Sequence, residues 1–458
     1  MVRPIVVWEE GDEVLSSQGG LGIIGALVDQ LPLGQRLNRT HIPENLKPDI
    51  AHRDIVVAYM GLLAQGKSDF DHIEAYRRDP FFGFSLGISQ VPSSPTVRQR
   101  LGQAAARDQH PLVQWSAIIR ESNVALLQKY ARLVPVTIDG KPYIPLDCDV
   151  SPFDNGKTRK EGGSRTYKGT DGYAPMMGYL GHDGYALAFE LREGKQHCQK
   201  GTPAFLVQCL RDAQAIITQR VDPAQHPRIL VRLDSGNDSA DNIDVIREEQ
   251  ADFLIKRNLR QQSLDAWLDR AKQEGAKSSP REGKSVYRGA FEESPRRGHA
   301  PERCVYQVIE RTITADGQIL LIPDIEVAAY WTSLTATPDD VLPWYPDHGT
   351  MEQYHSEVKT DMDLERLPSG KFATNQLVLH LACLTYNLLR VIGQATIGRE
   401  DVPLRKAAQR RRIRTVIQNI ILCAAKLVAH ARQYRIRYGR GNRWGRVTGQ
   451  LYAHFAAG

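Results

Sequence analysis

The first third of the chain carries the apolar spacing of α-helices. In residues 49–65, apolar side chains recur at positions that share one face of a helix. Residues 91–108 begin PSSPTVRQR, where Ser94 can cap a helix and a proline suits its first turn. We expect this helix to expose Arg98 and Arg100. Two short helices of this kind suit either a DNA-reading unit or a plain helical subdomain.

From residue 133 onward the apolar period changes from helical to alternating, which is typical of β-strands. An Asp-Gly pair between residues 134–138 and 143–150 predicts a hairpin. Other alternating or apolar runs predict strands at residues 173–180, 186–191, 228–233, 252–256, 304–312, 318–322 and 325–334. Helical patterns stand at residues 202–221, 242–250, 345–359 and 375–395.

The order of these elements predicts an α/β fold. Three antiparallel-type strands, a helix, a strand and a second helix come first, and further strands and helices follow. A mixed sheet with helices on both faces is the economical way to bury their apolar sides. Residues 257–303 interrupt this order with a polar stretch rich in Lys, Arg, Gly and Ser, which we interpret as an insertion or a long loop. Residues 156–172 have a similar composition and predict a flexible loop.

Acidic residues stand at the ends of two predicted strands. Strand 143–150 ends in LDCDVS, which places Asp147 and Asp149 on one face, and strand 228–233 leads directly into Asp234. A single aspartate at a strand end is more often a turn former or a helix cap. Two of them, together with a glutamate from a helix, can instead hold two divalent metal ions for phosphoryl transfer.

The candidate glutamate lies in WYPDHGTMEQYHSEVK, residues 344–359. An α-helix, at about 100° per residue, would project Tyr345, His348, Glu352 and Lys359 within roughly 60° of one another. An acid beside an aromatic ring, an imidazole and an ammonium group suits a metal ligand that faces a phosphate backbone. A solvated charged face with one incidental glutamate is the alternative.

Positive charge is concentrated at the C-terminal end of the sequence. The 458 residues include 59 Lys and Arg and 53 Asp and Glu, which gives a net charge of +6. The residues after Asp401 contain 13 Lys and Arg and no acidic residue, so the rest of the chain is net acidic. A basic region on a mildly acidic body predicts a polyanionic partner.

The basic region combines two patterns. Residues 404–430 carry a broad apolar face at helical spacing, and RQYRIRYGRGNRWGR follows, in which arginines from Arg432 onward alternate with aromatic residues. Cations for phosphates and rings for stacking suit nucleic acid, whereas a helix docked on the core with a solvated basic face is the alternative. The arginines that we expect to contact DNA include Arg410, Arg411, Arg412, Arg440 and Arg443.

Composition also limits the compartment. The six cysteines are scattered without any CxxC or Cys/His pairing, which argues against a zinc site and for a reducing environment. No run approaches the roughly 20 apolar residues of a membrane span, and the first 20 residues lack a signal-peptide pattern. We therefore expect a cytoplasmic protein that has no membrane partner.

Three motifs resemble those of DDE transposases of the IS4-like superfamily, and within it the IS1380 family of insertion sequences. LDCDVS is similar to the family's first-Asp strand, L-D-x-D-x-T, and LVRLDSG to its second-Asp motif, V-R-x-D-S-G. Tyr345, His348, Glu352 and Lys359 match the spacing of the signature Y-x2-R-x3-E-x6-K. DFDHIEAYRRDPFF, PSSPTVRQR and FATNQLVLHLACLTYNLL also resemble family regions, so the resemblance runs from about residue 70 to residue 389.

The resemblance implies a ribonuclease-H-like catalytic core with a β-rich insertion between the second Asp and the Glu. By position, Asp149, Asp234 and Glu352 would be the catalytic ligands of two Mg²⁺ or Mn²⁺ ions. Asp149 is preferred because Ser151 stands where the family has a hydroxyl residue, and Asp147, on the same strand face, is the alternative. Tyr345, Lys359 and the residue at position 348 would contact DNA at the transposon ends.

The resemblance also implies an activity and an organisation of the chain. The protein would bind terminal inverted repeats, cleave DNA and join the freed 3′ ends to target DNA, as a homodimer on paired ends. It would act in the bacterial cytoplasm, associated with the nucleoid when bound to DNA. The expected regions are a helical DNA-binding region at 1–132, a ribonuclease-H-like core at 133–257 and 319–395, an insertion at 258–318 and a basic helical tail at 396–458.

Two positions depart from the family pattern. His348 stands where the signature has Arg, which replaces a permanently charged bidentate fork by an imidazole. Ser151 replaces Thr, a milder change. Two other functions therefore stay open. One is a nuclease with the same core that hydrolyses DNA without strand transfer, and the other is a catalytically inactive DNA-binding derivative.

Overall fold

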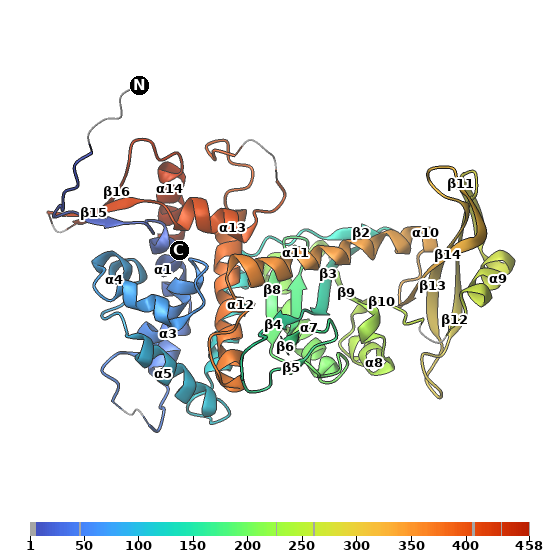
Figure 1. The fold of residues 1–458 in the computed structure, drawn as a ribbon, viewed down its shortest axis with the longest axis horizontal. Helices are drawn as coiled ribbons and strands as arrows, with labels where there is room; N and C mark the ends of the chain where they lie inside the picture. Colours follow the sequence, from blue (N-terminus) through green and yellow to red (C-terminus); the bar gives the residue numbers. More distant parts are fainter. Residues whose placement is uncertain are drawn as a thin grey trace. The chain divides into compact units, whose positions relative to one another are not determined.

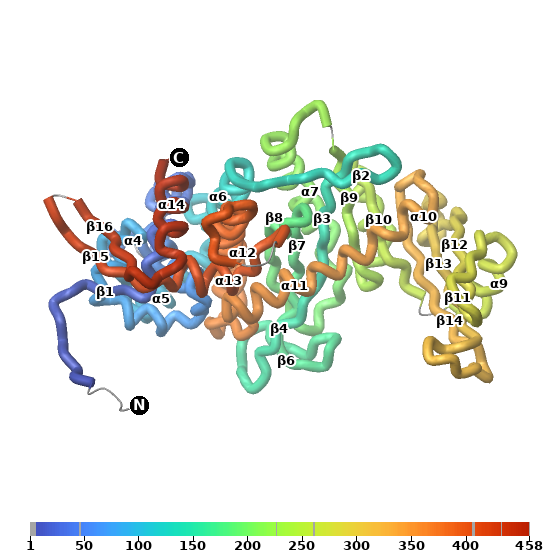
Figure 2. Tube along the Cα trace, turned by 90° about the horizontal axis from the view of Figure 1, so that it is seen from above, coloured from blue at the N-terminus to red at the C-terminus, as the bar shows by residue number. Residues whose placement is uncertain are grey.

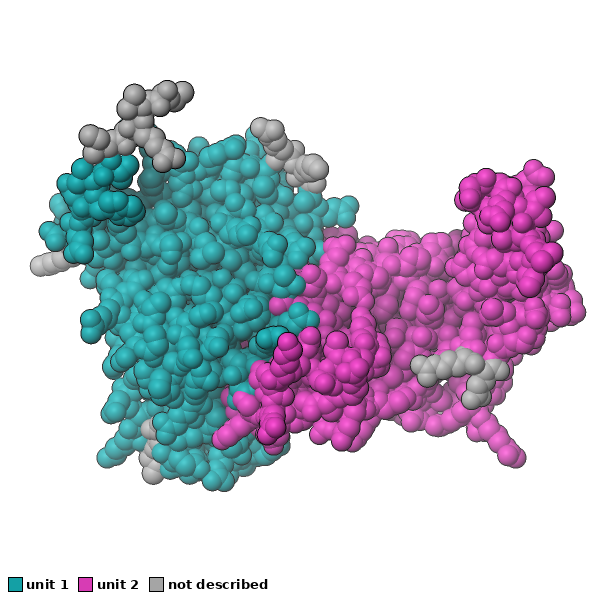
Figure 3. All heavy atoms as spheres, in the orientation of Figure 1, with its two compact units in different colours: residues 1–122, 360–369, 388–458 teal, residues 123–359, 370–387 magenta. Residues whose placement is uncertain are grey.

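The computed structural model describes residues 6–44, 47–225, 227–259, 262–404, 408–431 and 433–457, so Arg432 lies outside the described residues. The chain divides into two compact units, coloured separately in Figure 3. Unit 1 consists of Met1–Ser122, Thr360–Ser369 and Leu388–Gly458, and unit 2 consists of Asn123–Lys359 and Gly370–Asn387. The helical N-terminal region and the basic C-terminal region thus belong to the same unit.

The N-terminal part of unit 1 is helical, as the apolar spacing predicted. Nearly every residue of its third helix is buried, which makes this helix the centre of the unit. The cap of the fifth helix is Ser93 rather than Ser94, and its side chain accepts a hydrogen bond from the N–H of Thr96. The helices are α1 Leu21–Asp29, α2 Leu33–Asn38, α3 His52–Leu63, α4 Pro80–Leu86, α5 Ser94–Ala106 and α6 Trp115–Tyr130, with a 3₁₀ helix at Phe70–Tyr76.

The C-terminal part of unit 1 differs from the predicted helical tail. A short α13 (Ile413–Val416) and a π-helical turn are followed by a hairpin of β15 (Ala425–His430) and β16 (Gln433–Tyr438), and α14 (Gly445–Ala456) comes last. β15 also pairs antiparallel with β1 (Val14–Ser16), so strands from both parts of unit 1 share one sheet (Figures 1 and 2). The alternation in QYRIRY explains the strand, because aromatic and β-branched residues at a period of two favour sheets.

Unit 2 is built around a ten-stranded mixed sheet, which confirms the predicted α/β fold. Strands β3, β9 and β10 run parallel, whereas β7 is antiparallel to β3 and β14 is antiparallel to β10. The order is β11-β12-β13-β14-β10-β9-β3-β7-β8, and β2 pairs with β3. The strands are β2 Val136–Ile138, β3 Lys141–Val150, β7 Met176–Leu180, β8 Tyr185–Glu190, β9 Arg228–Leu233, β10 Asp252–Lys256, β11 Ala276–Arg281, β12 Lys284–Glu293, β13 Glu302–Ile313 and β14 Ile319–Thr332.

Helices cover both faces of this sheet. At Gly178 on β7, an added side chain would meet residues of α7. The next residue, Tyr179, points to the opposite face, where its ring packs against Tyr354 of α11 and Tyr386 of α12. The helices that begin in unit 2 are α7 Thr202–Arg220, α8 Ala240–Glu248, α9 Leu264–Glu274, α10 Pro338–Val341, α11 Met351–Ser356 and α12 Phe372–Gln394.

The described residues between 257 and 303 are folded, so the interpretation of this stretch as a long loop is wrong and the insertion is an ordered one. They contain α9, β11, β12 and the start of β13, and they extend the main sheet at one edge. β14 is one long strand where two were predicted. The polar composition concealed these elements because only a few apolar residues, such as Trp267, Val286 and Tyr287, are buried on their inner faces.

Residues 345–359 are helical but do not form one α-helix. A 3₁₀ helix at Pro346–Thr350 leads into α11, and a π-helical turn follows at Glu357–Asp361. The rotation per residue therefore changes twice, and the angles expected for a continuous α-helix do not apply. The buried side chains of Met351, Tyr354 and Val358 fasten the segment to the core.

Helix α12 is the apolar helix predicted at residues 375–395. Its length and composition would allow it to cross a membrane, but 89% of its most apolar stretch is buried inside the protein. Within unit 2 it is fastened by buried amides. Asn387 Nδ2 donates to the Asn123 side chain at 2.7 Å and to the Ala186 carbonyl at 2.6 Å, and its Oδ1 accepts from the Ala186 N–H at 2.9 Å.

We expect Asn387→Leu to destabilise unit 2 by about 1–3 kcal/mol for each buried polar group that it leaves unpaired. Urea unfolding followed by circular dichroism measures this loss. Ala373→Leu, at an exposed position of α12, is the control and should leave the unfolding midpoint in place. If the Asn387→Leu protein unfolds at the same urea concentration as the unaltered protein, the expectation is wrong.

Candidate active site

Two aspartates stand at the ends of neighbouring strands in the sheet of unit 2. β3 and β9 are parallel neighbours, and their register pairs Cys148 with Leu233. Asp149 is the next residue on β3, and Asp234 directly follows β9. Their side chains therefore start from adjacent positions at the carboxyl ends of two parallel strands, as the strand pattern indicated.

The two carboxylates have different local contacts. Asp149 Oδ1 accepts a hydrogen bond from the N–H of Val150 at 2.7 Å, and Asp234 Oδ1 accepts one from Asn237 Nδ2 at 2.8 Å. Gly236 lies in the turn after Asp234, where a Cβ atom would stand only 3.2 Å from Asp234 Oδ2. The glycine therefore allows the turn to fold closely over the carboxylate.

The third carboxylate, Glu352, is exposed in the first turn of α11. Burial and then the charge of Asp234 raise the pKa of Asp149 to about 7, and the charge of Glu352 acts in the same direction. The charges of Asp234 and Glu352 therefore both act on Asp149. Among the described residues, however, no three His, Cys, Asp or Glu side chains stand close enough together to hold a metal ion. The site therefore contains several negative charges, but its side chains do not form a complete set of metal ligands in this structure.

Asp147, the alternative first ligand, has protein donors on both oxygens. Arg232 donates from Nε and Nη2 to the two oxygens at 2.7 Å each, and His348 Nδ1 lies 2.9 Å from Oδ1. Burial alone would raise the pKa of Asp147, but the charge of Arg232 and the hydrogen bond from His348 lower it to about 2. This geometry favours Asp149 over Asp147 as the residue open to a metal ion.

Three residues were expected to lie on the same helix face as the exposed Glu352, but they are less exposed to solvent than it is. They are Tyr345, His348 and Lys359. His348 is only 7% exposed and faces Asp147. The half-buried ring of Tyr345 lies 4.5 Å from that of Tyr330 and 5.4 Å from the His348 ring, measured between centroids. Lys359 is half-buried in the π-helical turn, with its ammonium group 5.6 Å from the centre of the Phe153 ring. A buried His348 does not suit contact with a DNA backbone.

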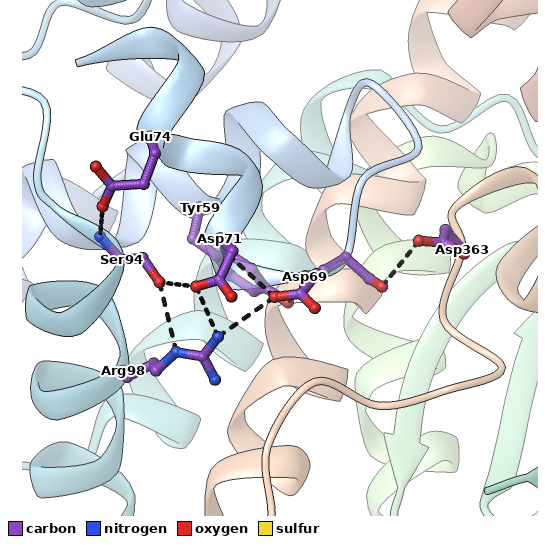
Figure 4. A network of polar contacts seen from close by, with 8 residues as sticks. Tyr59, Asp69, Asp71, Glu74, Ser94, Arg98 and Asp363 are labelled. Carbon is purple, nitrogen blue, oxygen red and sulfur yellow. Dashed lines mark hydrogen bonds and ion pairs between the residues drawn. The ribbon is translucent and has the colours of Figure 1, made fainter.

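The two arginines expected to be exposed on α5 have partners within unit 1. Arg98 donates to Asp71 at 2.8 Å and lies 3.5 Å from Asp69, and Figure 4 shows it pointing at both carboxylates. Arg100 is 4% exposed and donates to the carbonyl of Ile50 at 3.1 Å. The expected exposure of Arg100 is therefore wrong, because α5 turns this side chain inward, where it satisfies a buried carbonyl.

The arginine triplet of the basic region is partly engaged as well. Arg411 Nε donates to the Thr396 hydroxyl at 3.1 Å, and Arg412 makes a bidentate contact with Asp361 at 2.8 and 3.0 Å. Arg410 is half-buried. The charge of Arg412 is therefore already balanced inside unit 1.

Other cations of the basic region face solvent. Arg440 and Arg443 are exposed in the connection between β16 and α14. Arg435 and Arg437 are exposed on β16, and the register places Arg437 opposite Lys426 on β15. Directly opposed residues of an antiparallel pair lie on the same face, so the hairpin presents cations on one side.

Two residues beside the site were not identified from the sequence. Arg232 stands in the run RILVRL, where a cation two residues before Asp234 in an otherwise apolar strand was the available signal. Tyr167 lies in residues 156–172, which form part of a small sheet of β4 (Phe153–Asp154), β6 (Asp171–Tyr173) and β5 (Ser164–Arg165). Partial loss of water and then the charges of Asp149, Asp234 and Glu352 raise the pKa of Tyr167, although this residue is 69% exposed.

Comparison with known proteins assigns the chain to a family. The sequence matches the model of the family Transposase DDE domain group 1 over residues 2–456. Among solved structures, a piggyBac transposase synaptic complex with hairpin DNA is similar at 11% sequence identity and a TM-score of 0.39, over 90% of this chain and 82% of that chain. No curated protein matches the sequence. The chain belongs to the DDE transposases, a family of enzymes that act on DNA and normally use divalent metal ions.

The raised pKa of Asp149 predicts how its stability contribution depends on pH. The native state binds more protons at this carboxyl than the unfolded state between about pH 4 and pH 7, so stability falls as the pH rises through that window. In metal-free buffer, Asp149→Asn should therefore raise the melting temperature more at pH 8 than at pH 4. Calorimetry at both pH values tests this, with the exposed Asp316→Asn as a control. An equal effect at both pH values would contradict the raised pKa.

Proposed function

We propose that this protein is the transposase of an insertion sequence of the IS1380 family, within the IS4-like superfamily. It would cleave DNA at the ends of its element and join the freed 3′ ends to target DNA. Membership of the DDE transposase family supports the reaction class. The motifs LDCDVS and LVRLDSG and the spacing from Tyr345 to Lys359 support the narrower assignment. The observation that carries the proposal is the placement of Asp149 and Asp234 at the ends of the neighbouring parallel strands β3 and β9, with the charge of Glu352 acting on Asp149.

The sheet supports a ribonuclease-H-like core as the scaffold of this reaction. The aspartates stand at the ends of neighbouring central strands, and the glutamate stands on a later helix. Rigid parallel strands fix the first two carboxylates relative to each other. A helix joined to the sheet by side-chain contacts can bring the third carboxylate to them.

The donor set fits divalent metal ions. Three carboxylates without a balancing cation repel one another, which is one reason why the pKa of Asp149 is raised. Oxygen donors of this kind suit Mg²⁺ or Mn²⁺. We propose that Asp149, Asp234 and Glu352 hold two such ions, which when bound activate a water or a 3′-hydroxyl and stabilise the leaving oxygen.

Several cations are proposed to contact the DNA backbone. Tyr345 and Lys359 lie on the same segment as Glu352, and Arg410, Arg411 and Arg412 belong to the basic region. Arg412 is exposed but already faces Asp361, so we favour another part of that region. The exposed candidates are Arg435, Arg437, Arg440 and Arg443.

This function implies partners and a location. Two terminal inverted repeats must be brought together before they are joined to target DNA, so the proposed assembly is a homodimer on paired ends. The proposed location is the bacterial cytoplasm, on the nucleoid when the protein is bound to DNA.

We expect Asp149→Asn, Asp234→Asn and Glu352→Gln each to abolish cleavage and to retain binding of the element end. Each change removes a metal-holding charge while it keeps the shape of the side chain. The measurement is cleavage of a labelled DNA that carries an element end and its flank, with Mg²⁺, Mn²⁺ or Ca²⁺. Continued cutting by all three variants would show that the assignment is wrong. Binding without any cut by the unaltered protein would favour the inactive derivative.

Strand transfer separates the transposase from a nuclease with the same core. Precut element ends are offered together with a supercoiled plasmid and Mg²⁺. The proposal expects covalently joined products that depend on Glu352. Nicking or hydrolysis without joined products would favour the nuclease.

We expect Arg440→Gln with Arg443→Gln to weaken DNA binding and to reduce its salt dependence. The slope of log K against log salt should become shallower by about 0.9 for each phosphate that the protein no longer neutralises. Filter binding over a range of roughly 50–200 mM salt measures this slope. Arg98→Gln is the matched control, because Arg98 is balanced by Asp69 and Asp71 and should leave the slope unchanged.

A further inference from the structure

We infer that Asp147, Arg232 and His348 form a buried clamp that positions the three carboxylates of the active site. We call this group the Asp147 clamp, and its members act as positioning residues rather than as metal ligands. The inference rests on the proposed function, because it assigns a role toward the metal ions that Asp149, Asp234 and Glu352 are proposed to hold.

Each member of the clamp shares a chain segment with one carboxylate. Asp147 precedes Asp149 by two residues on β3, and Arg232 stands two residues before Asp234 at the end of β9. Residues two apart on a strand project to the same face. His348 lies four residues before Glu352, in the 3₁₀ helix that leads into α11. Each residue of the clamp therefore lies shortly before one of the three carboxylates on the same segment of the chain.

The contacts of the clamp join these three segments directly. Arg232 binds Asp147 through a two-pronged contact of 2.7 Å on each side, which fixes β9 against β3. Its Nη1 also donates to the carbonyl oxygen of Trp344 at 2.6 Å, just before the segment that carries Glu352. His348 completes the connection through its 2.9 Å contact with Asp147. Each pair of segments is thus held by at least one polar contact.

Burial makes these contacts strong and directional. Asp147 is 4% exposed, Arg232 is 2% exposed and His348 is 7% exposed. Arg232 donates to both oxygens of Asp147, and a proton on Nδ1 of His348 would make the 2.9 Å contact a third hydrogen bond to this carboxylate. Both oxygens are then satisfied by donors from other segments. Asp147 cannot turn toward a metal ion without leaving the buried charge of Arg232 without its carboxylate partner.

Of the three carboxylates, the exposed Glu352 depends most on support from the Asp147 clamp. Glu352 lies on α11, which extends only from Met351 to Ser356, whereas Asp149 is fixed by the sheet. Catalytic groups must be held to within roughly 0.5 Å of their working geometry, usually by residues around them. The contact between His348 and Asp147 links the start of this short helical segment to the strand that carries Asp149.

Two substitutions of His348 test the inference. His348→Leu removes the donor to Asp147, whereas His348→Asn places an amide N–H near the position of Nδ1 and can restore it. Mn²⁺ binding to the full chain is measured by electron paramagnetic resonance, and the Mg²⁺ dependence of cleavage is measured beside it. We expect His348→Leu to weaken Mn²⁺ binding by about 10–100-fold, the usual effect of removing a residue that supports metal ligands. His348→Asn should bind Mn²⁺ nearly as well as the unaltered protein, and both variants should bind element-end DNA normally.

A second variant keeps the test decisive if His348→Leu does not fold. Arg232→Lys retains a positive charge beside Asp147 but cannot make the two-pronged contact or the bond to Trp344. We expect it to weaken Mn²⁺ binding as well. Unchanged Mn²⁺ binding in Arg232→Lys or His348→Leu would overturn the inference, and so would an equal loss in His348→Leu and His348→Asn.

Asp149→Asn separates failure of the inference from failure of the proposed function. If Asp149→Asn loses Mn²⁺ binding and cleavage while His348→Leu keeps both, the clamp inference is wrong and the proposed function stands. If Asp149→Asn keeps both, the proposed metal site itself is wrong.

Discussion

The candidate active site of unit 2 depends on placing carboxylates of like charge together at the end of a sheet. The parallel pairing of β3 and β9 makes Asp149 and Asp234 neighbours, and α11 brings a third carboxylate within electrostatic range. The backbone hydrogen bonds of the ladder hold the strands against this repulsion. Burial and then the repulsion from Asp234 raise the pKa of Asp149, which shifts its carboxyl toward the neutral form. Divalent metal ions, which DDE transposases normally use, would offset this repulsion.

The two aspartates of LDCDVS show how much surroundings matter. They lie two residues apart on the same strand face, yet the pKa of one is lowered to about 2 and that of the other is raised to about 7. Asp147 faces Arg232 and His348, whereas Asp149 faces other carboxylates. Carboxyl groups whose surroundings shift their pKa values in opposite directions are suited to different roles.

The cations of unit 1 show a similar division. Net charge alone indicates a strongly basic C-terminal region, but Arg412 is balanced by Asp361. In the helical N-terminal part of unit 1, Arg98 faces Asp69 and Asp71. Part of the positive charge of the basic region is therefore paired inside unit 1, while Arg435, Arg437, Arg440 and Arg443 are exposed on β16 and on the connection that follows it.

The sequence by itself determined the features that depend on local pattern. Apolar periodicity located α3, α7 and α12 and the strands of the central sheet, because these elements bury one side along their whole length. It also placed Asp149 and Asp234 at the ends of two strands, and the motifs around them pointed to the transposase family that the family match then established.

The tertiary structure decided every feature that depends on a distant partner. A strand pattern shows that Asp147 and Asp149 share a face, but only the pairing with Arg232 and His348 distinguishes them. The same holds for the β15–β16 hairpin, which pairs with residues 14–16, and for the ordered insertion, whose polar strands extend an existing sheet. Local spacing gives the direction of a side chain, whereas its pKa and its contacts depend on residues that only folding brings close.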